Sequence, residues 1–220
     1  MHIHNLSEQN SILNSFLYEL RSMEVQKDSM RFRKNIQRIG EILSYEMSKT
    51  LGFNPSIVKT SLGEKKTMLP EENIVICSIL RAGLTLHNGV LNYFDKAENA
   101  FISAFRKHDP DDTSKFEIIV EYLACPSLEG KALVLVDPML ASGRSFFLTA
   151  EALKPYGNPK EIHLLSIVAS KEGVDFVNKK FPKESHLWVA DIDPDLNDYA
   201  YIVPGLGDAG DLAYGPKLQH

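Results

Sequence analysis

Hydrophobic residues follow two different spacings along the chain. From Asp28 to Leu51 they recur every three or four positions, which predicts an amphipathic helix, and we expect the first fifty residues to be mainly helical. From residue 73 onward they gather in short runs rich in β-branched and aromatic side chains, which predict strands. These runs are NIVICSIL (73–80), NAFISAF (99–105), FEIIVEYLA (116–124), KALVLVD (131–137), EIHLLSIVA (161–169) and HLWVAD (186–191).

Helical stretches separate several of the predicted strands, at 84–94, 145–156 and 172–181. Apolar strands that alternate with helices predict an α/β fold, with a mostly parallel sheet covered on both faces. In such sheets, ligands bind beyond the carboxyl ends of the strands, at a topological switch point. The polar segment 54–73 is interrupted by proline and glycine, which predicts a loop or a projecting hairpin.

Composition limits the compartment and the partners. The chain has 220 residues, enough for one well-buried domain, and its net charge of -5 gives no electrostatic footprint for nucleic acid. Cys77 and Cys125 lie far apart in apolar runs, which is typical of reduced thiols in a cytoplasmic protein. No stretch is long and apolar enough for a membrane span, and the first residues lack a basic start with an apolar core. His2 and His4 are interpreted as part of a ragged terminus.

A glycine-rich segment lies near the end of the chain. Gly205 to Gly210 spells G-x-G-x-x-G, the dinucleotide-binding pattern, which functions only between a strand and a helix. Only ten residues follow Gly210, so we expect no helix and returning strand there, and the dinucleotide interpretation fails. The segment is instead interpreted as a loop of small residues that lets backbone approach a ligand closely, with Asp208 and Asp211 beside it.

The segment Lys131 to Leu153 has the strongest functional pattern. A buried strand ends at Asp137, a short loop follows, and a helix is expected to begin near Ser145. The free N–H groups at that helix start would bind an anion, and Asp137 is suited to accept hydrogen bonds from the vicinal hydroxyls of a sugar. The residues of a P-loop are missing. A plain strand–turn–helix, with Ser142 or Ser145 as the helix cap, is the alternative interpretation.

Two arginines stand at predicted strand ends. Arg81 follows the first apolar strand and can clamp a diphosphate through paired, charge-assisted hydrogen bonds. Arg106 ends the next strand, before the polar segment KHDPDDTSK, a pattern typical of a lid that closes over a leaving group. The alternative for Arg81 is an arginine that is simply solvated at a strand end.

Several motifs together resemble the type I phosphoribosyltransferases. A hydrophobic strand, an acid and then "ASGRS" are similar to the phosphoribosyl-diphosphate loop of that family, and "DPMLASG" resembles the form found in the uracil phosphoribosyltransferase family. "ILRAGL" (79–84) and "YIVPGLGDAGD" (201–211) are also similar to segments of that family, in the same order. The resemblance covers nearly the whole chain.

The resemblance implies a single domain with three parts: an N-terminal helical and arm region (1–72), a sheet core (73–191) and a C-terminal hood over the base (192–220). It implies transfer of a phosphoribosyl group from 5-phospho-α-D-ribosyl 1-diphosphate (PRPP) to uracil. Mg²⁺ would be carried mainly by PRPP, because Pro138 replaces an acid of the usual pair, and no metal site made by the protein alone is expected. A homo-oligomer is expected, with GTP as an allosteric activator left open.

The same resemblance assigns the candidate site residues. Arg81, Arg106 and Asp208 are the candidate catalytic residues. The uracil-binding candidates are Ile202, Gly207, Asp208 and Ala209. The PRPP-binding candidates are Arg81, Arg106, Asp137, Pro138, Met139, Leu140, Ala141, Ser142, Gly143, Arg144, Ser145 and Asp208.

The phosphate loop departs from the family pattern. Arg144 stands where a second glycine is usual, and Ser142 replaces a threonine. We expect the Arg144 side chain to point into solvent, because an anion cradle is made of backbone N–H groups. A nucleotide-binding regulatory or sensor protein that retains the fold is the alternative to an enzyme.

Overall fold

The computed structural model describes residues 1–108 and 116–217, and for 104–108 and 116–120 it describes the backbone alone. Its main sheet has the strand order β1-β10-β9-β7-β4-β5-β6, and β8 pairs with β9. All of these pairs are parallel except β5 with β6, which confirms the mostly parallel sheet expected from the apolar runs. The strands are β1 (His2–Asn5), β4 (Ile74–Ile79), β5 (Glu98–His108), β6 (Phe116–Ala124), β7 (Ala132–Val136), β8 (Met139–Leu140), β9 (Glu161–Ser170) and β10 (His186–Asp193).

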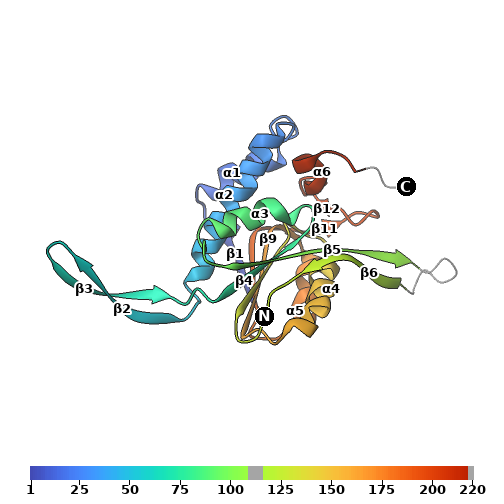
Figure 1. The fold of residues 1–220 in the computed structure, drawn as a ribbon. Coiled ribbons are helices and arrows are strands. Elements are labelled where there is room, and N and C mark those ends of the chain that lie inside the picture. Colours follow the sequence, from blue (N-terminus) through green and yellow to red (C-terminus); the bar gives the residue numbers. More distant parts are fainter. Residues whose placement is uncertain (109–115, 218–220) are drawn as a thin grey trace.

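Helices cover both faces of this sheet. The helices on one face bury apolar side chains against it, and a second core forms beneath the helices on the other face. Figure 1 shows the helices on the two sides of the sheet. On the first face lie α1 (Leu13–Arg21), α2 (Ser29–Ser48), α3 (Gly83–Leu91) and α6 (Ala209–Tyr214), and on the second lie α4 (Arg144–Leu153) and α5 (Lys171–Lys180). Short 3-10 turns occur at Leu6–Glu8 and Lys154–Tyr156.

The topology of the sheet has one switch point. From β4 the chain leaves through α3 to β5 on one side, whereas β7, on the other side of β4, continues through α4 to β9. The connections after β4 and β7 therefore diverge, and a crevice opens between their carboxyl ends. Arg81 and Asp137 follow these two strands, so the fold itself brings them to one place.

Three expectations about local structure were wrong. Residues 2–5 are not helical or ragged but form β1, which pairs in parallel with β10 from His2↔His186 to Asn5↔Val189. Met139–Leu140 are not simply loop: they add the short strand β8 beside β9. A helix does form here: α6 begins at Ala209, within the glycine-rich segment, because the Asp208 side chain accepts a hydrogen bond from Asp211 N–H and caps it. The helix is only six residues long, and no strand follows it in the described part of the chain.

The expected hairpin is present between α2 and β4. Strands β2 (Phe53–Thr60) and β3 (Gly63–Pro70) pair along their whole length and project from the body of the protein (Figure 1). At the other end of the chain, β11 (Asp195–Leu196) and β12 (Ile202–Val203) form a small antiparallel pair next to α6. No helix in the described residues has both the length and the apolar character required to span a bilayer.

Candidate active site

A pocket of about 200 Å³ lies at the switch point. It is lined from the core by Ala82, which follows β4, and by Asp137, Met139 and Ala141, which follow β7. The opposite wall comes from the C-terminal hood: Ala200, Tyr201, Ile202, Gly207, Asp208, Ala209 and Gly210. Two segments that the sequence assigned separately to PRPP and to a base therefore form one cavity.

Asp137 provides an unusual charge environment in this pocket. Burial, reinforced by the negative charge of Asp208, raises the pKa of Asp137 from 3.8 to about 7, although a hydrogen bond from Met139 N–H opposes the shift. A strongly perturbed carboxyl in a crevice is typical of a functional site. The Asp137 side chain is therefore able to accept hydrogen bonds from sugar hydroxyls once it is ionised.

The start of α4 lacks a side-chain cap. Gly143 is the N-cap residue, with a φ of 73°, and neither Ser142 nor Ser145 caps the helix. A side chain at position 143 would meet Phe176 and Val177 of α5 at 2.9 Å, so glycine is required by packing as well as by its backbone conformation. Because no side chain occupies the first N–H groups, they are left for an external anion. The cap expected in the plain strand–turn–helix interpretation is absent.

The loop between β7 and α4 is anchored on β9. The Pro138 carbonyl accepts hydrogen bonds from Ile167 N–H at 3.0 Å and Val168 N–H at 3.1 Å, and Leu140 is fully buried. Pro138 and Leu140 therefore fix the loop and are turned away from the pocket. Met139 and Ala141, in contrast, line it. Only part of the predicted PRPP-binding segment faces the cavity.

The three arginines of the predicted site are placed differently. Arg81 is 43% exposed and donates from Nη2 to Asp211 Oδ1 at 2.9 Å, which links the end of β4 to the hood. Arg144 is exposed and lines a separate groove with Asp175 and Lys179 of α5. This position agrees with the expectation that Arg144 points away from the cradle. Arg106 belongs to β5 and is paired with Ile118, but its side chain lies outside the described part of the chain. Of the proposed lid at 107–115, the structure describes only the backbone of 107–108, which continues β5.

Close packing explains why residue 83 is a glycine, which the sequence motif did not reveal. A side chain there would lie 2.6 Å from the Val136 carbonyl and 2.8 Å from Ser78 Oγ. Gly83 thus allows α3 to start directly against β4 and β7, which holds Ala82 at the pocket wall. Among residues that the sequence did not single out, Ala82 and Ala200 line the pocket, and neither carries a chemical signature that would have marked it.

A parallel sheet whose switch point holds an acid, a short anchored loop and an uncapped helix start is the arrangement of the type I phosphoribosyltransferases, and this is the class that the fold defines. The family model for uracil phosphoribosyltransferase matches residues 7–216, and the chain belongs to that family.

Individual relatives agree with this assignment. The chain is 48% identical over 218 residues to the uracil phosphoribosyltransferase of Porphyromonas gingivalis, covering 99% of this chain and 100% of the relative. It is 36% identical over 215 residues to that of Pyrococcus furiosus, covering 96% and 90%. Among solved structures, the AQ2163 protein from Aquifex aeolicus is similar with a TM-score of 0.84 at 30% identity, covering 99% of this chain and 100% of that chain.

Proposed function

We propose that this protein transfers the 5-phosphoribosyl group of PRPP to uracil and releases diphosphate and uridine monophosphate. The observation that carries the proposal is the single pocket that joins the loop after β7 to residues 200–210 of the hood, which we call the hood loop. The membership of the chain in the uracil phosphoribosyltransferase family supports the substrate class. The regulatory or sensor alternative is not favoured, because relatives named as the enzyme match over the whole chain.

Base recognition would depend on the backbone of the hood. Uracil is flat and presents alternating donors and acceptors along its edge, which backbone amides and carbonyls can match. Ile202, Gly207 and Ala209 line the pocket without bulky polar side chains, and the φ of 94° at Gly207 turns the backbone in a way that other residues rarely adopt. We assign these three residues to uracil.

PRPP would lie on the core side of the pocket. The ionised Asp137 would accept hydrogen bonds from the ribose hydroxyls, and the uncapped start of α4, from Gly143 to Ser145, would bind the 5-phosphate. Asp208 lines the opposite wall, and there it would face the donor together with the base. The positive charges of Arg81 and Arg106 would stabilise the diphosphate as it leaves.

In the reaction, uracil N1 forms a bond to C1 of the ribose as the bond from C1 to the diphosphate oxygen breaks. The diphosphate takes the bonding electrons, and the N1 proton leaves to solvent. Holding base and sugar in line lowers the barrier of this reaction further.

The whole chain would act as one domain, since the pocket needs both the core and the hood. Its three parts are 1–72, 73–191 and 192–220.

Mg²⁺ fits this site as a companion of PRPP. Pro138 stands beside Asp137, and no group of three or more histidine, cysteine or acidic side chains in the described residues is arranged to hold a metal ion. The carboxylates of Asp137 and Asp208 are the groups in the pocket that an incoming ion on the diphosphate would meet. When bound, Mg²⁺ would neutralise charge on the leaving diphosphate.

We also propose a homo-oligomer in the cytoplasm. The β2–β3 hairpin carries exposed apolar side chains at Ile57, Val58, Leu62, Met68 and Leu69. An isolated two-stranded hairpin is marginally stable in water, so a second copy of the chain covering these side chains would stabilise it.

Both cysteines are free thiols, in agreement with a reducing compartment. Activation by GTP is tested by adding it to the assay.

The function is tested by a spectrophotometric assay that offers each nucleobase with PRPP and Mg²⁺. Uracil should release diphosphate and form uridine monophosphate, and omission of Mg²⁺ should abolish turnover. Turnover with a purine but not with uracil would refute the substrate assignment, and binding of PRPP without any turnover would favour the sensor alternative.

A further inference from the structure

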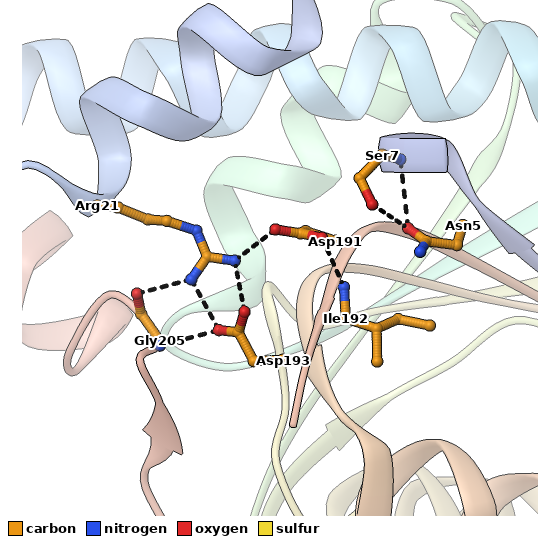
Figure 2. Close-up of polar contacts among 7 residues, drawn as sticks. All are labelled: Asn5, Ser7, Arg21, Asp191, Ile192, Asp193 and Gly205. Carbon is orange, nitrogen blue, oxygen red and sulfur yellow. Dashed lines mark hydrogen bonds and ion pairs between the residues drawn. The ribbon is translucent and has the colours of Figure 1, made fainter. Parts of the chain in front are cut away.

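An ion-pair network ties α1 to the back of the hood loop (Figure 2). Arg21, the last residue of α1, donates from Nη1 to Asp193 Oδ2 at 2.7 Å and from Nη2 to Asp193 Oδ1 at 2.9 Å. Its Nη2 also donates to Asp191 Oδ2 at 2.8 Å. Two parallel hydrogen bonds between a guanidinium and a carboxylate give a fixed geometry as well as attraction.

Both backbone groups of Gly205 are held by this network. The Gly205 N–H donates to Asp193 Oδ2 at 2.8 Å, and its carbonyl accepts from Arg21 Nη1 at 3.0 Å (Figure 2). Gly205 has a φ of 58°, and a side chain there would lie 2.1 Å from the Ile202 carbonyl. The loop therefore makes a tight turn at Gly205, and the turn is fixed by residues from α1 and β10.

Gly205 does not line the pocket, but residues two or three positions away from it in the sequence do. Ile202 precedes it and Gly207 follows it, and both belong to the pocket wall. The adjoining strand β12 has only two residues, so regular backbone pairing gives this segment little support. Ile202 and Leu206 are buried in the core, and the backbone turn between them depends on the contacts that hold Gly205 from behind.

The network is sufficiently buried to influence the loop. The side chains of Arg21 and Asp193 are 21% and 7% exposed, whereas exposed ion pairs contribute little. Removing one member of a buried pair leaves an uncompensated charge, which the loop would relieve by moving toward water.

We propose that Arg21 and Asp193 are positioning residues for the nucleobase: they fix Gly205 so that the backbone of Ile202 and Gly207 is presented to the base. This inference rests on the proposed function. Neither side chain lines the pocket, so both act through the loop.

The first test is steady-state kinetics of Arg21→Ala, Arg21→Lys and Asp193→Asn. Arg21→Ala should raise KM for uracil by about tenfold or more, the size expected when a hydrogen bond to a charged group is lost. The KM for PRPP should change much less, because the core side of the pocket is untouched. Arg21→Lys keeps the charge but not the paired geometry, so it should restore part of the loss.

Asp193→Asn separates the two contacts. The amide oxygen can still accept from Gly205 N–H, but the amide nitrogen faces a donor of Arg21, so a smaller rise in KM for uracil than in Arg21→Ala is expected. The matched control is Arg31→Ala, which removes an arginine that pairs with Glu19 through two contacts of 3.0 Å, away from the hood loop. That control should leave KM for uracil unchanged.

The second test is amide hydrogen exchange over residues 198–206, compared in the wild type, Arg21→Ala and Arg31→Ala. Exchange should be faster in Arg21→Ala alone. This measurement does not need turnover, so an inactive wild type would refute the proposed function while the exchange still tests the network. An unchanged KM for uracil with unchanged exchange would overturn the inference. An equal rise in KM for both substrates, together with a lower Tm and no rescue by lysine, would overturn it as well.

Discussion

Asp137 and Asp208 line the same pocket from the two sides of the crevice, and the charge of Asp208 adds to the effect of burial in raising the pKa of Asp137 to about 7. Two carboxyls so placed resist being ionised together. A ligand that brings hydroxyl donors to Asp137, or cations to both, would relieve this repulsion.

The raised pKa of Asp137 predicts a pH-dependent stability. Between pH 3.8 and about 7 the folded protein keeps a proton on Asp137 that the unfolded chain has lost. The free energy of unfolding should therefore fall as pH rises through this window, by at most about 1.4 kcal/mol per pH unit from this group. Asp137→Asn should remove that slope and be the more stable protein at pH 8. Asp208→Asn removes one cause of the raised pKa of Asp137, so the upper end of this pH window should move to lower pH. Denaturant unfolding at a series of pH values measures both effects, and equal slopes in wild type and Asp137→Asn would contradict the prediction.

The Arg81–Asp211 ion pair predicts how Arg81 acts. Both side chains are more than a third exposed, so the pair is weak and a diphosphate can displace Asp211. Arg81→Ala should lower kcat/KM for PRPP by about 10²–10³, the loss typical of one group that stabilises developing charge. Arg81→Lys should restore little, because a lysine cannot reproduce paired contacts. Asp211→Asn is the control and should not raise KM for PRPP. Near-normal kcat/KM in Arg81→Ala would remove Arg81 from the mechanism, and the same kinetic test applies to Arg106→Ala.

The exposed position of Arg144 predicts a minor role in donor binding. Arg144→Gly introduces the residue usual in related loops, and it should change the Kd for PRPP by less than about tenfold, or 1.4 kcal/mol. Isothermal calorimetry measures this directly. Lys179→Ala, in the same groove outside the pocket, is the matched control. A loss greater than tenfold in Arg144→Gly alone would show that Arg144 contacts the phosphate.

His163 and Trp188 form a buried pair at the other end of the sheet. Trp188 Nε1 can only donate, and it donates to His163 Nδ1 at 3.3 Å, so the proton of neutral His163 lies on Nε2, facing Glu161 Oε2 at 3.3 Å. Burial, with the added charge of His186, lowers the pKa of His163 from 6.5 to about 4, although Glu161 opposes the shift. Protonation of Nδ1 would break the contact with Trp188.

Acid should therefore destabilise the protein through His163. The unfolded chain takes up a proton below pH 6.5, whereas the folded protein does so only near pH 4, so the free energy of unfolding should fall as pH drops through this window. Trp188 is the chain's one tryptophan, so its fluorescence reports the unfolding transition. His163→Asn retains an acceptor for Trp188 but cannot titrate, and it should flatten the pH dependence of the midpoint. An unchanged dependence in His163→Asn would contradict this role.

Local patterns predicted the elements whose residues carry a regular hydrophobic spacing or an unbroken apolar run. The amphipathic spacing after Asp28 predicted α2, and the structure has that helix from Ser29 to Ser48 with Asp28 as its cap. The apolar runs around Ile74–Ile79 and Ala132–Val136 predicted the two central strands, since strands buried on both faces must be apolar throughout. The residues that follow these strands then predicted a site at their carboxyl ends.

By itself, then, the sequence determined the alternation of strands and helices, the acid and the short loop after β7, and the family resemblance, because each depends on neighbouring residues in the chain. Only the tertiary structure decided the rest. It made a strand of His2–Asn5, whose polar sequence gains its order from pairing with β10. It also joined Arg21 to Asp193 and Gly205. Those contacts connect positions far apart in the chain, and no spacing or composition can encode them, because they exist only once the sheet has brought α1 and the hood together.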